Sequence, residues 1–320
     1  MLTIKQPGPL TTLQDLGRNG SAHLGIGHAG AADQPALRLA NALVGNPASA
    51  CALEATLLGP SLIFDHDVVV AVTGAPLSKA RIGDQPLPPW QAVHVPSGTP
   101  LTLGPMAHGC RSYLAVAGGI DVPCWRQSRS TDINAGLGPI PRALEAGDTL
   151  PIGHTTSKLP ADVDWSLDPR PWFQASTSHR IRLLPGSHAE RLDAASRERL
   201  VNESFRIGND SNRVGLRLEG PHLALDDALE MTSEGVVAGT MQLPPGGQPI
   251  IMGCEHPVTG GYPRIAHVCA VDLPVLAQCR PGDTVTFEWI DKAGAMELLA
   301  TREDALEHLV DRIRERLEQA

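Results

Sequence analysis

Aromatic side chains are scarce in this sequence: Phe, Trp and Tyr together make up 3% of its 320 residues. Glycine and proline are abundant instead, with 32 and 28 residues. This balance favours many short strands and tight turns over long helices. Hydrophobic residues make up 42% and charged residues 19%, so the chain can bury a core in two domains or one large one.

The sequence also lacks an excess of positive charge, closely spaced cysteine pairs and long apolar runs. The formal net charge of −9 argues against a nucleic-acid partner, which needs a basic face. The six cysteines include no C-x-x-C pair, which indicates reduced thiols and not a disulfide framework. The start MLTIKQPGPL lacks the layout of a signal peptide, and runs such as VVVAV at 68–72 are too short to span a bilayer. We therefore expect a soluble, cytoplasmic protein with no membrane contact.

Several well-known catalytic motifs are missing. The sequence has no G-x-x-x-x-G-K-[ST] and no G-x-S-x-G. GIGHAG at 25–30 matches G-x-G-x-x-G, but RNGSAHL before it is not a buried strand, and Asp33 would repel a pyrophosphate. Cys254, Glu255 and His256 are metal ligands by type, yet consecutive side chains of an extended segment point to opposite faces. We predict neither a dinucleotide site nor a metal site.

The order of elements predicts a mainly β protein with a few helices. Residues 1–153 form an N-terminal β-rich domain with a helix at 34–44, which Asp33 caps and Pro47 ends. Residues 154–178 are rich in Pro, Asp and Ser and are predicted to be a linker. Residues 179–292 form a second β-rich domain, and 293–320 form an amphipathic C-terminal helix.

Polar residues gather in a few short segments. In TTLQDLGR at 11–18, Leu13 and Leu16 can share the inner face of one helical turn ended by Gly17, which leaves Gln14, Asp15 and Arg18 on a tight loop. Asp15 and Arg18 could equally form a purely structural ion pair. In the helix, Asn41 lies on an apolar stripe, either satisfied by a backbone group or anchoring neighbouring loops.

Two further segments suggest ligand contact. The backbone N–H groups beside Ser128, Arg129 and Ser130 could cradle a carboxylate or phosphate, although a polar surface loop explains SRST equally well. VTGGYPRIA at 258–266 combines two glycines with the donors Thr259, Tyr262 and Arg264, and a wide turn is the alternative.

Taken in order, the motifs resemble one family. They are GPLTTLQDLGRNG, HAGAADQPALRLANALVGNPASACALEATLLGP, VAVTGAP, SRSTDINAGLG, NRVGLRLEGP, SEGVVAGTMQLPPGGQPII and TGGYPRIA. The chain resembles the family of the 5-oxoprolinase C subunit, also described as allophanate hydrolase subunit 2 or biotin-dependent carboxyltransferase. The resemblance covers roughly residues 3–290 and leaves out the C-terminal helix.

The resemblance implies a cyclophilin-like β-barrel in the second domain. It also implies a hydrolase assembly with a homologous B-type subunit and an A-type subunit, which opens 5-oxoproline to glutamate at the expense of ATP. ATP is the implied cofactor, and Mg²⁺ is a further candidate. A second implied function is a carboxyltransferase that moves a carboxyl group from carboxybiotin to urea or a similar amide. This chain has no A-M-K-M motif, so the biotin would be carried by a partner. A third is a non-catalytic regulatory protein that binds a kinase inhibitor.

Residue types and motif positions then suggest roles. Asp15, Arg18 and Glu234 are the predicted catalytic residues, with the arginine neutralising negative charge and the acids orienting it or acting as base. The predicted substrate-binding residues are Gln14, Asn41, Glu54, Ser128, Arg129, Ser130, Arg213, Gln242, Thr259, Gly260, Gly261, Tyr262 and Arg264. We expect the TTLQDLGR loop to be pinned against Asn41 and Glu54, and the loops of both halves to form one pocket for a flat amide.

The sequence departs from the family at one place near this predicted pocket. Many relatives read D-x-Q-T-T-G-G-Y-P where this chain has Glu255, Pro257 and Val258 in place of the Asp, the Gln and the first Thr. Before Arg142 the usual Gly is Pro141. The loss of two polar groups predicts a different amide substrate or a loss of catalysis.

Overall fold

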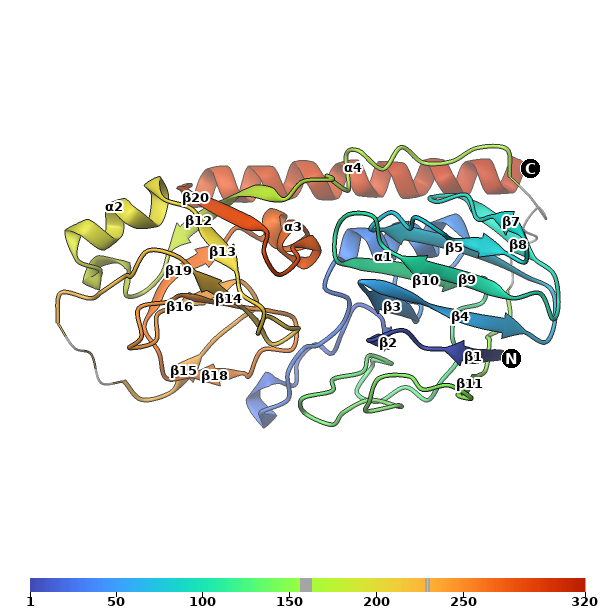
Figure 1. The fold of residues 1–320 in the computed structure, drawn as a ribbon, viewed down its shortest axis with the longest axis horizontal. Coiled ribbons are helices and arrows are strands. Elements are labelled where there is room, and N and C mark those ends of the chain that lie inside the picture. Colours follow the sequence, from blue (N-terminus) through green and yellow to red (C-terminus); the bar gives the residue numbers. More distant parts are fainter. Residues whose placement is uncertain (156–162, 228, 230, 320) are drawn as a thin grey trace. The chain divides into compact units, whose positions relative to one another are not determined.

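The computed structural model describes residues 1–155, 163–227, 229 and 231–319. The chain divides into two compact units. The first unit comprises Met1–Asn19, Asp33–Ala175 and Ala305–Ala320, and the second comprises Gly20–Ala32 and Ser176–Asp304. Both units are built mainly from β-strands (Figure 1), so the predicted fold class is confirmed.

The described strands of the first unit form two sheets. One has the order β11 (Thr149–Leu150), β1 (Leu2–Gln6), β4 (Leu58–Phe64), β9 (Leu101–Pro105), β6 (Arg81–Ile82) and β7 (Gln85–Pro86). The other has the order β2 (Thr11–Gln14), β3 (Ala52–Thr56), β10 (Arg111–Val116), β5 (Val68–Gly74) and β8 (Ala92–Val95). Leu62 of the first sheet and Leu114 of the second belong to the same hydrophobic core.

Helix α1 (Gln34–Leu43) packs on β5 and β10 of the second sheet. Its first turn is capped as the sequence predicts, because the Asp33 side chain accepts a hydrogen bond from Ala36 N at 3.1 Å. Pro35 lies in the first turn, and Gly45 just beyond the end has φ +68°. Since β10 meets the core on one face and α1 on the other, all of its residues are buried.

The segment TTLQDLGR is not a helical turn, and that prediction is wrong. Thr11–Gln14 form strand β2, which pairs antiparallel with β3 and is buried at every residue. A strand covered on both faces shows no polar–apolar alternation, so its β character was hidden in the sequence. Gly17 follows with φ +87° and turns the chain after the strand.

The described strands of the second unit include seven that close into a barrel. Their order is β12 (Ser178–Pro185), β19 (Arg264–Val268), β16 (Thr240–Gln242), β17 (Ile250–Met252), β14 (Gly215–Glu219), β13 (Phe205–Ile207) and β20 (Thr284–Trp289). Parallel pairing of β20 with β12 closes the ring. The core includes Phe205 and Phe287, whose ring centroids lie 5.6 Å apart. The prediction of a β-barrel in the second half is confirmed.

Shorter elements complete the second unit. In chain order, helix α2 (Ala194–Asn202) lies between β12 and β13, and helix α3 (Leu273–Gln278) lies between β19 and β20. Helix α2 contacts β20. A separate two-stranded ribbon pairs β15 (Glu234–Gly235) with β18 (Thr259–Gly260).

The C-terminal helix α4 (Lys292–Gln319) is one continuous helix. In the first unit its residues Leu306, Ile313 and Leu317 share a hydrophobic cluster with Leu39 and Trp90. Part of the predicted linker 154–178, residues 156–162, lies outside the described residues. Its described part contributes Val163 and, partly buried, Trp165, Leu167, Trp172 and Phe173 to the same cluster.

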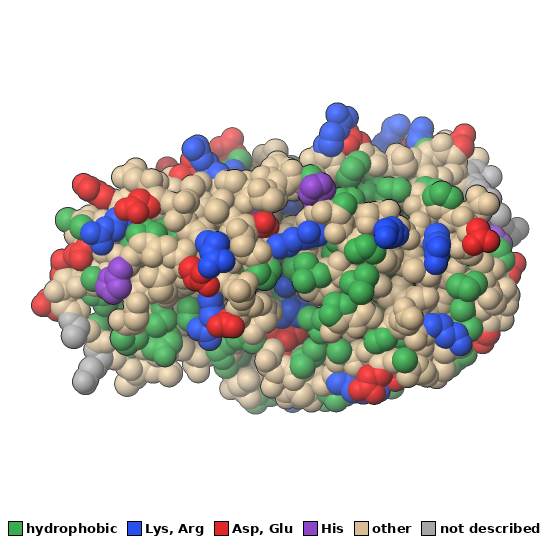
Figure 2. Space-filling view, viewed as in Figure 1, with side chains coloured by type: hydrophobic (Ala, Val, Ile, Leu, Met, Phe, Trp, Pro, Cys, Tyr) green, Lys and Arg blue, Asp and Glu red, His purple; other side chains and the backbone are tan. Residues whose placement is uncertain are grey.

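Charged side chains of both signs are interspersed on the face shown in Figure 2. Among the described residues, no helix is both long enough and apolar enough to cross a membrane.

Candidate functional site

In the first unit, five of the predicted site residues form one connected group, which we name the Asp15 cluster: Asp15, Arg18, Ser128, Arg129 and Ser130. The Asp15 carboxylate is its centre. Oδ1 accepts hydrogen bonds from Ser128 Oγ at 2.8 Å and from Ser130 Oγ at 2.5 Å, while Oδ2 accepts one from Arg129 N at 2.6 Å. Gly17 N adds a fourth donor at 2.8 Å. The carboxylate is buried and accepts one hydrogen bond from the hydroxyl of each serine.

The predicted anion cradle is filled from within the chain. Arg129 N donates to Asp15, Ser130 N donates to Ser128 Oγ at 3.0 Å, and Ser128 N donates to Trp125 O at 3.0 Å. The anion that these N–H groups recognise is therefore the carboxylate of Asp15. Gly138 permits this close packing, because a Cβ at its φ of +111° would lie 2.4 Å from Ser130 O.

Arg18 is almost fully buried, with 2% of its surface exposed. Its Nη2 donates to Ser130 O, and its guanidinium carbon lies 5.5 Å from the centroid of the Trp125 ring. Among the described residues, the contacts of Asp15 run to the serine loop and to Gly17, so the alternative Asp15–Arg18 ion pair is absent. The Arg129 side chain turns outward to Val122 O and Asp121.

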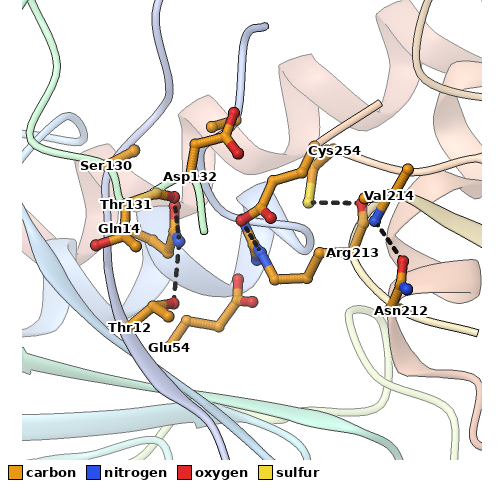
Figure 3. A network of polar contacts seen from close by, with 12 residues as sticks. Thr12, Gln14, Glu54, Ser130, Thr131, Asp132, Asn212, Arg213, Val214 and Cys254 are labelled. Carbon is orange, nitrogen blue, oxygen red and sulfur yellow. Dashed lines mark hydrogen bonds and ion pairs between the residues drawn. The ribbon is translucent and has the colours of Figure 1, made fainter. Parts of the chain in front are cut away.

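Gln14 extends the Asp15 cluster on the strand side. Its amide nitrogen donates to Thr12 Oγ1 at 3.0 Å and to Thr131 O at 3.1 Å, as Figure 3 shows. Its oxygen Oε1 is buried and has no hydrogen-bond partner among the described residues. The burial of the nearby thiol of Cys51 raises its pKa, and the negative charge of Asp15 raises it further, so this cysteine is not a nucleophile at neutral pH.

The described side-chain hydrogen bonds of Asn41 and Glu54 run to residues outside TTLQDLGR, whereas the backbone of Glu54 is the register partner of Thr12 in the pairing of β3 with β2. Asn41 Nδ2 donates to Ala50 O at 2.9 Å, which is the backbone contact that the sequence offered as one of two interpretations. Glu54 accepts a hydrogen bond from Tyr113 Oη at 2.8 Å, and Arg111 Nε lies 3.5 Å from its other oxygen. The described side-chain hydrogen bonds of Gln14, Asp15 and Arg18 connect the segment mainly to residues 128–131.

The second unit places its predicted residues in two groups. The first is a buried ion pair in which Arg213 Nε lies 2.6 Å from Glu255 Oε1, with side chains 3% and 1% exposed. Arg213 Nη2 also donates to Gly30 O at 2.7 Å. Cys254 Sγ contacts Arg213 O, as Figure 3 shows. Glu255, at the position where the family resemblance leads us to expect Asp, therefore pairs with an arginine.

The second group, which we name the Glu234 ribbon, comprises β15, β18 and Arg264. Arg264 Nη2 pairs with Glu234 Oε2, and Arg264 Nη1 donates to Gly235 O at 2.9 Å. The buried Gln242 donates to Tyr262 O at 3.4 Å, and a Cβ on Gly260 would lie 2.4 Å from Gln242 Nε2. The side chains of Thr259 and Tyr262 are exposed.

A groove of about 290 Å³ also lies in the second unit. Arg217, Glu219 and Gln248 are among its lining residues, and none of the predicted site residues lines it. Among the described residues, no group of three or more His, Cys, Asp or Glu side chains could hold a metal ion.

Sequence reasoning missed two contributors. Tyr113 accepts a hydrogen bond from Asp33 N at 2.8 Å and donates to Glu54. Burial, followed by the charge of Glu54, raises the pKa of Tyr113, which keeps its hydroxyl protonated as a donor. Trp125 contacts Arg18. The low number of these residues in the sequence, 2 tyrosines and 5 tryptophans, is the signal that could have drawn attention to them.

A family description, "Carboxyltransferase domain, subdomain A and B", matches residues 24–289. The chain belongs to this carboxyltransferase family. Over 307 residues it is 41% identical to the C subunit of 5-oxoprolinase from Escherichia coli (strain K12), covering 95% of each chain. It is 35% identical to the C subunit of 5-oxoprolinase from Haemophilus influenzae, covering 97% of this chain and 99% of that one. The predicted family is confirmed.

A solved structure similar to this chain has a different enzyme name. The urea amidolyase of K. lactis superposes with a TM-score of 0.88 at 29% identity, covering 98% of this chain and 20% of that chain. The chain is thus similar to C subunits of 5-oxoprolinase over nearly their whole length and to one segment of a much longer urea amidolyase.

Proposed function

We propose that this chain is the C-type subunit of an ATP-dependent 5-oxoprolinase, which opens the cyclic amide of 5-oxoproline to give glutamate. It acts with a homologous B-type subunit and an A-type subunit. The observation that carries the proposal is the match to the 5-oxoprolinase C subunit of Escherichia coli over 95% of both chains.

The Asp15 cluster suits an amide that also carries a carboxylate. Ser128 Oγ and Ser130 Oγ both donate to Asp15, and each also accepts a hydrogen bond from a backbone N–H, so the two hydroxyls are held in fixed orientations. Gln14 Oε1 is a buried acceptor beside them that has no hydrogen-bond partner among the described residues, and an amide N–H would suit it. Arg18 supplies positive charge for a carboxylate or for negative charge that develops during ring opening.

Within this arrangement Asp15 is proposed to orient the serines and not to act as the base. Four donors already surround its carboxylate, so it could accept a substrate proton only by losing one of them. Glu234 remains the proposed acid–base candidate, because its side chain is 47% exposed and has a single described ion-pair partner, Arg264.

The residues present do not fit ATP with Mg²⁺ at the Asp15 cluster. The N–H groups of Ser128, Arg129 and Ser130 are taken by internal partners, and the described residues offer no cluster of metal ligands. We therefore assign nucleotide binding to one of the partner subunits, and this chain to holding the amide.

The test is reconstitution with candidate B-type and A-type subunits. Glutamate released from 5-oxoproline is measured with and without ATP, and again after Arg18→Ala. ATP-dependent release that is lost in Arg18→Ala complexes supports the proposal. A complex that forms but releases no glutamate under any condition contradicts it.

A carboxyltransferase is the second candidate. The superposition on the K. lactis urea amidolyase over 98% of this chain favours it. Turnover of urea that depends on a biotinylated partner, in the same reconstituted system, would single it out. A third candidate, a regulatory protein that binds a kinase inhibitor, is favoured by Pro257 and Val258, which replace two polar family residues. Tight partner binding without turnover would identify it.

A further inference from the structure

A histidine ring takes part in the pairing of strand β19 at its first residue, Arg264. His188 N donates to Arg264 O at 2.9 Å, and Arg264 N donates to His188 Nδ1 at 3.2 Å. Ser187 Oγ lies 3.1 Å from the same ring nitrogen. Gly186 allows this approach, because a Cβ there would lie 2.3 Å from Arg264 O. A backbone N–H can only donate, so His188 Nδ1 is an acceptor and carries no proton.

Arg264 connects this ring to the Glu234 ribbon. Its backbone is bonded to His188, while its guanidinium pairs with Glu234 Oε2 and donates to Gly235 O at 2.9 Å. The Arg264 side chain is 16% exposed, whereas that of Glu234 is 47% exposed. The exposed carboxylate of Glu234 is therefore fixed by a more deeply buried arginine, and the backbone of that arginine is fixed by His188.

A second histidine is connected to Val237, just beyond the first strand of the ribbon. His267 Nδ1 lies 3.3 Å from Thr240 Oγ1, and that hydroxyl oxygen accepts a hydrogen bond from Val237 N at 3.1 Å. Thr240 is fully buried, so its hydroxyl proton needs an acceptor, and among the described residues His267 Nδ1 provides one. The residues opposite His267 on the neighbouring strands, Thr240 on β16 and Leu184 on β12, are uncharged. The neutral form of this ring thus holds the chain that leaves β15.

Protonation would break both connections. A protonated Nδ1 is a donor, so it can accept a hydrogen bond neither from Arg264 N nor from the Thr240 hydroxyl. Arg264 and Arg191 are the charges that act on His188. His267 has Arg264 as its charged neighbour. Burial, followed by these positive charges, lowers the pKa of both imidazoles, so both rings are neutral at pH 7.

We propose that His188 and His267 are positioning residues for the Glu234 ribbon, which holds the Glu234 carboxylate in place only while both rings are neutral. This inference rests on the proposed function, in which Glu234 is the acid–base residue, and deepens it by adding control through pH. A ring that is freed when the ribbon opens regains the ordinary histidine pKa of about 6.5. The ribbon is therefore held above that pH, and the open population rises by up to about tenfold per ring for each pH unit below it.

The first experiment measures opening of the ribbon in the full chain alone. Amide hydrogen exchange is followed by NMR between pH 7.5 and 5, with the rates corrected for the intrinsic effect of pH. Protection of the Arg264 and Val237 amides should fall at least about tenfold over this range, and protection of the β20 amides in the barrel should fall less. His188→Asn combined with His267→Asn should remove this difference, because the new amide oxygen is an acceptor near the position of Nδ1 and does not titrate.

His179→Asn is the matched control. His179 lies in the same unit and burial also lowers its pKa, but the groups that act on it are Asp283 and Ser176, outside the ribbon. This variant should leave the pH dependence of the Arg264 and Val237 amides unchanged. Equal protection of these two amides at pH 7.5 and pH 5 in the wild type would overturn the inference. So would a His179→Asn chain that loses the pH dependence as well.

The second experiment uses the reconstituted complex. His188→Ala combined with His267→Ala removes both acceptors and should lower kcat for glutamate release about tenfold at pH 7.5, with a smaller change in KM. The variant with His188→Asn and His267→Asn should recover most of this kcat. It should also lose less activity than the wild type between pH 7.5 and 5.5, whereas His179→Asn should follow the wild type.

The outcomes separate this inference from the proposed function. If glutamate release is intact but the variant with His188→Asn and His267→Asn loses activity with pH as the wild type does, the positioning role fails and the proposed function stands. If the asparagine substitutions do not recover the kcat lost with alanine, the rings support only the fold and the inference fails. If the wild-type complex releases no glutamate, the proposed function fails, and hydrogen exchange still decides whether the two rings hold the ribbon.

Discussion

The Asp15 cluster and the Glu234 ribbon carry most of the predicted site residues, and they are built in opposite ways. In the Asp15 cluster a buried carboxylate is surrounded by four donors from its own chain. In the Glu234 ribbon the Glu234 side chain is 47% exposed. Glu234 lies on a two-stranded ribbon whose second strand is followed by the exposed Tyr262. The first is a rigid arrangement completed before any ligand arrives, and the second leaves its polar groups accessible. Substitutions in the two groups should therefore have different effects. In the Asp15 cluster they should lower both turnover and the free energy of unfolding, whereas in the Glu234 ribbon they should lower turnover with little loss of stability.

The largest effect is expected at the Arg213–Glu255 pair, which is buried like the Asp15 cluster. Glu255→Ala leaves the Arg213 guanidinium without that carboxylate and should lower the free energy of unfolding by about 3–5 kcal/mol. Urea denaturation measures the loss. Replacing both residues by apolar ones, Arg213→Met with Glu255→Leu, should recover much of it. A Glu255→Ala chain as stable as wild type would show that burial in this region does not govern stability.

Asp15→Asn should come next. An amide NH₂ placed among the donors Ser128, Ser130 and Arg129 N leaves at least one of them unsatisfied, at a cost of about 2–3 kcal/mol. Glutamate release by the complex should fall with it, because the serines lose their orientation. The control is Asp168→Asn, a carboxylate paired with Arg170 on the surface, which should leave the melting temperature unchanged. Normal turnover by the Asp15→Asn variant would contradict the proposed orienting role.

Gly260→Ala probes the ribbon through its backbone. The added Cβ would lie 2.4 Å from Gln242 Nε2, so the amide must move and give up its bond to Tyr262 O. The loss should be about 1 kcal/mol in thermal unfolding. Gly261→Ala is a matched control, because its Cβ meets only Ser233 Oγ at 3.5 Å. Equal losses for the two variants would mean that Gln242 does not brace the ribbon.

Glu234→Gln should change stability least, by less than about 1 kcal/mol, because the ion pair with Arg264 is partly exposed. If Glu234 is the acid–base residue, the same variant should lower kcat strongly at every pH. This split between stability and turnover is the sharpest contrast with Asp15. A Glu234→Gln complex with normal kcat removes Glu234 from the chemistry.

Three histidines of the second unit should make a smaller, pH-dependent contribution to the free energy of unfolding. Burial lowers the pKa of His179 and His267, and burial together with Arg264 and Arg191 lowers that of His188. Because these imidazoles are harder to protonate when folded, the unfolded chain binds more protons below about pH 6.5. Their contribution to stability is full above that pH and is lost as the pH falls. His179→Asn, His188→Asn and His267→Asn combined should flatten the decline between pH 7 and 5 in urea unfolding, and an unchanged slope would contradict the assignment.

The sequence predicted elements better than contacts. Local signals placed helix α1, because its cap, its proline and its terminal glycine lie within the segment itself. Strand β2 was missed because burial on both faces removed its alternation. The joining of Asp15 to Ser128 and Ser130 spans more than a hundred residues, and no local pattern encodes such a pairing. The expectation that the loops of both halves share one pocket stays a prediction.

The C-terminal helix lies outside the region that matches the family description, yet it is part of the folded core of the first unit. The family description ends at residue 289, yet Leu306, Ile313 and Leu317 of α4 are buried with Leu39 and Trp90. A gene cut at the family boundary would yield a polypeptide whose tryptophan-lined apolar surface faces water, with aggregation as the expected outcome. Anyone who transplants this domain into another protein should carry the helix with it.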